Sequence, residues 1–256
     1  MSTKTLADYK GLEGISLQVK FTRNEFLDSL LDGNLFMNNF KYFIELERKM
    51  KVKGQGDKLE AGFVFRGTNA KIYYQGQEVG QAKFAEVVER YSEAEKLPVF
   101  CLAMFDSKDL KIIEENEKGL VVKVELPKEE QEAFINDFGP VAVVLPGDFY
   151  DRINKTAKEQ EVECIAGRVA YLDYNQHDSE RKKMFDEGST DMFFWKDEFF
   201  KYQRECRIVL TDNFVENNTS LNIGSIRDKA IVIDTKEFFE TTVFDIPFKD
   251  FEDLTK

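Results

Sequence analysis

Histidine, cysteine and proline are scarce in this sequence. Its 256 residues include one histidine, three cysteines and five prolines. Zinc sites and other histidine-rich metal centres need clustered nitrogen and sulfur ligands, so the scarcity excludes them, although an all-carboxylate Mg²⁺ site stays open. A Ser-His-Asp mechanism would depend on His177 alone, which lies in a polar stretch and is expected to be exposed. Cys101, Cys164 and Cys206 are far apart, which is typical of reduced, buried thiols rather than of a disulfide framework.

Long apolar segments are also missing. No apolar run approaches the roughly 18 residues needed to span a bilayer, and the first ten residues lack the apolar core of a secretory signal. We therefore expect a soluble, cytoplasmic chain with no membrane partner. Charged residues make up 33% and hydrophobic residues 42%, which is a folding composition. With no repeat, linker or low-complexity segment, residues 1–256 are predicted to form a single domain.

The charge of the chain is acidic and unevenly distributed. The formal net charge is −12. Residues 1–60 hold ten Lys/Arg and nine Asp/Glu, a balance of 10 − 9 = +1, so the remainder carries −12 − 1 = −13. Such a chain repels phosphate wherever its basic residues are not clustered, which argues against broad binding of duplex nucleic acid. The balance modestly favours a small anionic ligand, such as a nucleotide, near the first 60 residues.

The pattern of apolar residues predicts strands and helices that mingle without a regular βαβ rhythm. The expected strands span 15–21, 62–67, 70–80, 98–105, 119–126, 141–145, 162–174, 206–212, 220–224 and 229–234. The expected helices span 24–33, 39–53, 82–94, 127–139 and 148–160. A hairpin is expected to turn at Gln75-Gly76. The result indicates an α+β fold with a mixed or antiparallel central sheet and flanking helices.

The most unusual segment is 191–210, which holds the single tryptophan, Trp195, and a dense set of charges before a strand. In it, Gln203 and Glu205 are two residues apart, so a strand would place both on one face, with Arg204 on the other. A carboxylate can stabilise the positive charge of a developing oxocarbenium ion, and a neutral amide can orient an acceptor. Glu-x-Glu spacing recurs elsewhere in the chain, so the spacing alone decides nothing.

Each candidate residue of this segment, and of the 56–62 loop, also has a purely structural interpretation. Lys196 and Arg207 are candidate cofactor-binding cations, or else the ion-pair partners of Glu205. Trp195 could stack on a nicotinamide or adenine ring, although such aromatic residues more often belong to the core. Asp57 and Glu60 could hold Mg²⁺ or a cationic group, but beside Lys58 we expect them to be solvated loop carboxylates.

Three segments carry a resemblance to a known family. FTRNEFLDSLLDGNLFMNNFKYF (21–43), GDKLEAG (56–62) and WKDEFFKYQRECRIVL (195–210) resemble a broad, mostly uncharacterised family of bacterial and phage proteins. In that family a strand-helix opening is followed by a "gD..eg" turn and a closing "K…f..q.E.R" strand. The family name carries no activity, and a phage-host or antiviral-defence setting is all that it implies.

The same pieces resemble, at a greater distance, ADP-ribosyltransferases of the Arg-Ser-Glu type. In those enzymes the first strand supplies a phosphate-binding Arg, a middle strand a Ser/Thr patch, and a late Glu binds the nicotinamide ribose. The resemblance implies NAD as substrate, Glu205 as catalytic carboxylate, Gln203 as acceptor-side amide, and Arg23 or its rival Arg66 as phosphate ligand. PVFCLAMFDS is a departure, because Cys101 stands where a hydroxyl is expected.

Two classes of function follow from these observations. The first is an NAD-dependent ADP-ribosyltransferase or NAD glycohydrolase. The alternative is a non-enzymatic acidic protein that binds a host protein or a nucleotide signal, because acidic surfaces speed association with basic partners. A carboxylate-metal nuclease built on Asp57 and Glu60 is a weaker option, since the sequence offers no third placed carboxylate, and no metal is predicted.

Overall fold

A computed structural model describes residues 4–50 and 54–248, with the side chain of Met50 left aside. Its largest component is a mainly antiparallel eight-stranded sheet, in which one path of hydrogen-bonded neighbours runs β13-β2-β5-β1-β8-β14, while β12 joins β5 to β9. These strands are β1 (Ser16–Thr22), β2 (Asn34–Asn39), β5 (Pro98–Asp106), β8 (Val141–Val144), β9 (Cys164–Arg168), β12 (Glu205–Leu210), β13 (Asn218–Asn222) and β14 (Ile231–Asp234). The expected α+β fold with an antiparallel central sheet is confirmed.

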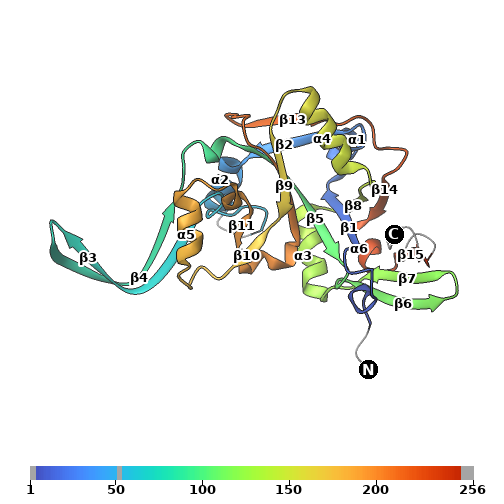
Figure 1. Ribbon diagram of the computed structural model, residues 1–256, viewed down its shortest axis with the longest axis horizontal. Coiled ribbons are helices and arrows are strands. Elements are labelled where there is room, and N and C mark those ends of the chain that lie inside the picture. The colour runs from blue at the N-terminus through green and yellow to red at the C-terminus, as the bar shows by residue number, and fades with distance from the viewer. Residues whose placement is uncertain (1–3, 51–53, 249–256) are drawn as a thin grey trace.

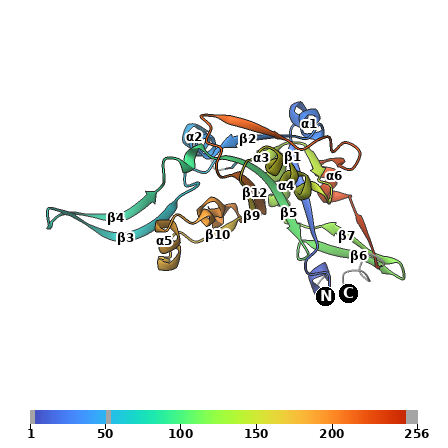
Figure 2. The same ribbon diagram turned by 45° about the horizontal axis from the view of Figure 1, so that its top comes forward.

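Three smaller sheets surround the central one. They comprise the hairpin β3 (Phe63–Tyr74) and β4 (Gln77–Glu89), the sheet of β6 (Leu110–Asn116), β7 (Gly119–Val124) and β15 (Phe244–Pro247), and the pair β10 (Ala170–Leu172) and β11 (Trp195–Asp197). The last is the only parallel pair among the described strands. The β3–β4 hairpin projects far from the rest of the molecule (Figures 1 and 2).

Helices cover both faces of the central sheet. The α-helices are α1 (Asn24–Leu31), α2 (Phe40–Met50), α3 (Lys128–Phe138), α4 (Phe149–Glu159), α5 (Ser179–Asp186) and α6 (Thr235–Glu240), joined by short 3-10 turns η1 (Leu6–Asp8), η2 (Ala94–Lys96), η3 (Thr190–Phe194) and η4 (Glu198–Gln203). None of the described helices is long and apolar enough to cross a membrane.

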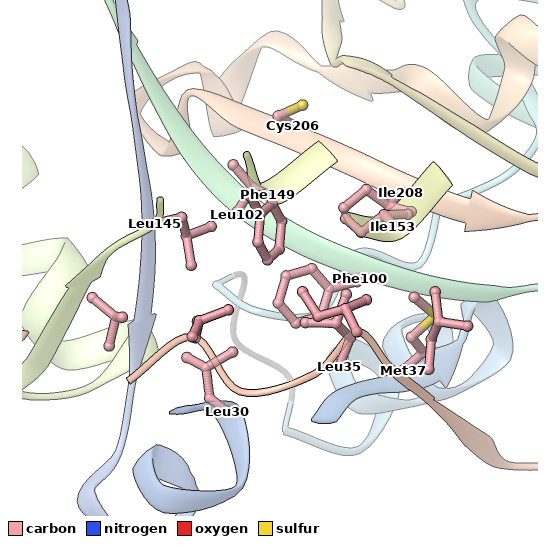
Figure 3. Close-up of a cluster of buried hydrophobic side chains, with 14 of the residues drawn as sticks. Leu30, Leu35, Met37, Phe100, Leu102, Leu145, Phe149, Ile153, Cys206 and Ile208 are labelled. Atoms are coloured by element: carbon pink, nitrogen blue, oxygen red, sulfur yellow. The ribbon is translucent and has the colours of Figure 1, made fainter. Parts of the chain in front are cut away.

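One face of the sheet packs against α4. Phe100 and Leu102 of β5 point to this side with Ile208 of β12, and they meet Phe149 and Ile153 of α4 (Figure 3). Alternate residues of the same strands point to the opposite face, as the two-residue period of a strand requires. This cluster therefore closes one side of the sheet and leaves the other side for a second core and a cavity.

The opposite face of the sheet is covered by two separate clusters. Val19 and Phe105 pack under Phe134 of α3 in one cluster, while Val99 and Phe40 of α2 belong to another. Stacked and edge-on contacts among phenylalanine rings hold the first cluster together: the Phe21 ring stacks on Phe239 and meets Phe105 edge-on. Because the two clusters are distinct, space remains between α2 and α3 over the middle of the sheet.

Most predicted elements on the described residues are found, with two clear exceptions. The hairpin does turn at Gln75-Gly76, where both residues have positive φ values of 49° and 82°. The helix expected over 82–94 is wrong, because most of that segment is the second strand of the hairpin, β4, paired along its length with β3. The single strand expected over 162–174 is also wrong: it breaks at Val169 into β9 and β10, which join different sheets. Residues 51–53, predicted to end a helix, lie outside the described residues.

Candidate functional site

A cavity of about 480 Å³ opens between α2 and α3, over the middle of the central sheet. Its floor includes Gln203, Glu205 and Arg207 from the end of η4 and the start of β12, together with Lys196 of β11. Its walls are rich in aromatic rings, namely Phe21, Phe26, Phe36, Phe40, Tyr42, Phe43, Phe134 and Phe138. A mostly apolar pocket with a few convergent charged groups is the usual form of a ligand site.

The cavity lies where the central sheet splits. Strand β5 pairs with β1 only as far as Val19 opposite Ala103, and with β2 only at Pro98 and Val99. No strand pairing therefore joins the middle of β5 to either neighbour on this edge. Lys20 of β1 reaches across the split, where its Nζ donates a 2.6 Å hydrogen bond to the backbone oxygen of Cys101. The split thus brings a cation and strand backbone to the cavity.

Burial affects the charge of Lys20. Desolvation lowers the pKa of its ammonium group, and the negative charge of Glu205 only partly offsets that effect. The ammonium lies 4.4 Å from the centre of the Phe100 ring, which provides a cation–π contact. Sequence reasoning missed this residue, although one signal was present: a lysine between Val19 and Phe21 in an expected strand.

Four charged side chains form a closed network on the cavity floor. The carboxylate of Glu205 accepts a 2.6 Å hydrogen bond from Lys196 Nζ and a 2.7 Å bond from Arg207 Nε. Arg207 Nη2 also donates to Glu60 Oε1 at 2.8 Å. All four residues are at least nine-tenths buried. The network joins the 56–62 and 195–210 segments, which the sequence resemblance had grouped and which are far apart in the chain.

The network keeps Glu205 ionised. Burial alone would raise its pKa, but the positive charges of Arg207 and Lys196 outweigh that effect and hold the pKa below its usual range. Desolvation alone would lower the pKa of Lys196 and of Arg207, but the negative charges of Glu205 and Glu60 raise both. The floor therefore carries fixed charges of both signs at neutral pH, in surroundings of low dielectric constant.

Gln203 and Glu205 share one side for a reason other than strand alternation. Arg204, between them, has a left-handed backbone with φ of 47°. This turn sends the Arg204 side chain to the opposite side, where it pairs with Asp109 and Glu130. Gln203 meanwhile accepts a 2.9 Å hydrogen bond from Lys196 and donates one to the Gly54 oxygen. Left-handed non-glycine residues are uncommon and often occur where a site needs them.

Glu60 belongs to this network and Asp57 is buried near it, so the expectation that they are solvated loop carboxylates is wrong. Asp57 is 1% exposed and Glu60 is 3% exposed. Asp57 Oδ2 and Glu60 Oε2 have no hydrogen-bond partner. Burial, followed by the charge of Glu60, raises the pKa of Asp57 to about 7. Among the described residues, no group of three or more histidine, cysteine or acidic side chains is arranged to hold a metal ion.

The remaining candidates lie in three different places. Arg23 lines the mouth of the cavity at the start of α1 and is exposed. Arg66 is outside the cavity lining, where it pairs with Glu86 and Asp197 at 2.9 Å each. Trp195 is buried in the cluster beneath α2 and does not line the cavity. His177 is exposed, as expected.

Comparison of the chain with protein-family models, with curated proteins and with solved structures finds no match in any of the three.

Proposed function

We propose that this chain binds NAD in the cavity and cleaves its N-glycosidic bond, as an ADP-ribosyltransferase-like protein that transfers ADP-ribose to a macromolecule or to water. One observation carries the proposal: Glu205 and Gln203 share the floor of an aromatic-walled cavity whose mouth holds Arg23. These are the residues to which the sequence resemblance gives the catalytic, acceptor-side and phosphate-binding roles. Arg23 and Glu205 are far apart in the sequence, and the fold places both in the lining of the same cavity.

The order of strands supports the same proposal. The resemblance calls for a first strand, a middle strand and a late glutamate strand that act together. In this chain the corresponding strands β1, β5 and β12 are direct neighbours, with β5 in the centre. Two departures remain: β1 itself presents Lys20 to the cavity, with Arg23 just beyond its end, and β5 presents the thiol Cys101 instead of a hydroxyl.

The proposed reaction needs an ionised carboxylate close to the ribose. The C1′–N bond breaks, and its electron pair leaves with nicotinamide, which departs uncharged. The ribosyl cation that develops at C1′ is stabilised by Glu205, whose lowered pKa keeps it negative. The acceptor oxygen or nitrogen then bonds to C1′ and releases its proton to solvent.

Glu205 can take this role without leaving its network. Each carboxylate oxygen has two acceptor sites, and the network uses one on each: Oε1 accepts from Arg207 and Oε2 accepts from Lys196. A ribose hydroxyl can therefore donate to either oxygen while both cations stay in place. The Gln203 amide is held by Lys196 and by the Gly54 oxygen, so it presents a fixed orientation to an acceptor.

The test is release of nicotinamide from NAD by the purified chain. We expect Glu205→Gln to lower that rate by about 100-fold or more, because a neutral amide cannot balance the ribosyl charge. Glu86→Gln is the matched control, since Glu86 is also an ion-paired carboxylate but lies outside the cavity lining. Circular dichroism and the melting temperature establish that both variants fold.

Two results would contradict the proposal. One is the absence of any NAD-dependent rise in melting temperature together with no release of nicotinamide by the wild-type chain. The other is a folded Glu205→Gln variant that releases nicotinamide as fast as the Glu86→Gln control.

A further inference from the structure

Three exposed aromatic side chains gather at the mouth of the cavity. Phe26 of α1, Phe36 of β2 and Tyr42 of α2 all line it, and their exposed fractions are 57%, 53% and 44%. Other aromatic residues of the walls, such as Phe40 and Phe134, are 1% exposed and belong to the core clusters. Burial in the core therefore accounts for the deep rings but not for the three at the mouth.

The mouth also carries a cation with no ion-pair partner. Arg23 is the N-cap residue that immediately precedes α1, and Phe26 lies three positions later, in the first turn of that helix. Arg23 is exposed and lines the cavity, and among the described residues it enters no ion pair within 4 Å. In a chain with a net charge of −12, an exposed guanidinium that lines the same cavity as three exposed aromatic rings favours an anionic aromatic ligand.

We propose that this mouth is the subsite for the nucleobase and adjoining phosphate of a nucleotide. The base stacks on the rings of Phe26, Phe36 and Tyr42, and the phosphate pairs with Arg23. The inference rests on the proposed function in one respect: NAD then lies with its adenylate half at the mouth and its nicotinamide ribose over Glu205. Exposed aromatic rings can stack on any nucleobase, because every base has a flat aromatic face.

The chain offers a matched control for the aromatic mouth. Phe214 is 54% exposed, almost the same fraction as Phe36, but it does not line the cavity. Replacing either residue by alanine removes a half-exposed ring at similar cost to the fold. A difference between the two variants in ligand binding therefore reports on the mouth rather than on stability.

The experiment measures the affinity of the full chain for ADP-ribose and for ribose 5-phosphate by isothermal titration calorimetry. We expect the wild-type chain to bind ADP-ribose more tightly than the base-free sugar phosphate. Phe36→Ala should weaken ADP-ribose binding by about tenfold, with Phe214→Ala unchanged. Phe26→Ala is a second variant for which we expect the same loss of ADP-ribose affinity. Arg23→Gln should weaken the binding of both ligands, because both carry a phosphate.

The outcomes separate this subsite from the proposed reaction. The subsite is overturned if wild-type chain does not bind ADP-ribose, or if Phe36→Ala and Phe26→Ala bind it as tightly as Phe214→Ala does. If that happens while NAD is still cleaved in a Glu205-dependent way, the reaction stands and the subsite fails. If ADP-ribose binding depends on Phe36 but no nicotinamide is released, the subsite stands and the reaction fails.

Discussion

The cavity and the β3–β4 hairpin both expose aromatic residues to solvent, and they differ in what surrounds the rings. At the cavity, Phe26 and Phe36 stand on elements that pack into the core, beside charged groups with fixed partners. Along the hairpin, Tyr73, Tyr74 and Phe84 stand on a two-stranded ribbon and are more than half exposed. Exposed aromatic residues therefore occur in both regions, whereas at the cavity they accompany a network of buried charges and on the hairpin the neighbouring charges are more exposed.

The two regions differ in how firmly tertiary contacts hold their side chains in place, and a binding site needs such contacts as well as suitable residue types. The base of the hairpin is anchored, since Arg181 donates a hydrogen bond to the Val64 oxygen and Phe63 packs on Phe185. Beyond Thr68, the hydrogen bonds between β3 and β4 are the main support. Isolated two-stranded hairpins are marginally stable in water. The cavity floor, in contrast, is held by contacts between segments well over 100 residues apart.

The largest expected effect comes from breaking the charged floor. Arg207→Met leaves Glu60 and Glu205 without their shared cation in a buried setting, so we expect the free energy of unfolding to fall by about 3–5 kcal/mol. Urea denaturation measures it. Lys71→Met removes an ion pair with Glu78 on the hairpin and should leave the urea midpoint unchanged within error. Equal losses in the two variants would contradict the comparison.

A second effect concerns pH and also separates the two regions. The pKa of Asp57 is about 7 in the folded chain, above the ordinary value of 3.8, so the folded state binds its proton more tightly than the unfolded state. Stability from this group is therefore present below about pH 4 and is lost as the pH rises through 7, by up to about 4 kcal/mol.

Substitution at the same position tests this pH dependence. Asp57→Asn should remove the fall in stability between pH 4 and 7 and should make the chain more stable than wild type at pH 8. Glu78→Gln on the hairpin, where an exposed carboxylate has a pKa lowered by hydrogen bonds to Gln81 and Lys71, should leave that fall in place. Unfolding curves across this pH range decide; an unchanged slope in Asp57→Asn would mean that another group titrates.

The third expected effect involves no substitution and concerns local opening of the hairpin. We expect backbone amides of 68–84 to exchange with solvent orders of magnitude faster than those of β5 and β12, because few long-range contacts hold the hairpin closed. Hydrogen exchange followed by mass spectrometry measures this difference. Protection of the hairpin equal to that of the central strands would show that the two regions unfold together and would remove the contrast drawn above.

Much of the local structure could be predicted from the sequence because its signals act over a few residues. The helix α3 follows Pro127 and ends before Gly139, whose φ of 117° suits glycine alone. The alternating faces of segment 82–94 predict a helix, and the segment also contains good helix formers such as alanine and glutamate. Pairing with β3 overrides that helix preference. Strand formation here depends on the partner strand, which the segment by itself does not reveal.

The candidate site divides in the same way. The sequence singled out Glu205 and Gln203 as a carboxylate and an amide at a strand start, and the family resemblance added Arg23 as a phosphate ligand. It could not predict that Glu60 would be buried against Arg207 or that Lys20 would reach Cys101 across the sheet. The Lys20 contact depends on the register of β1 and β5, which stop pairing at Val19 and Ala103, and the Glu60 contact depends on where the 57–62 turn meets β12.

The sequence by itself determined the class of fold, the hairpin turn and the residues able to carry the proposed chemistry, since these follow from local preference and side-chain type. Only the tertiary structure decided that Arg23 would share a cavity with Glu205 while Arg66 would not. The physical reason is that charge pairing and strand splitting depend on which segments become neighbours. Which segments become neighbours depends on how the whole apolar core is buried, and this cannot be read from any single segment.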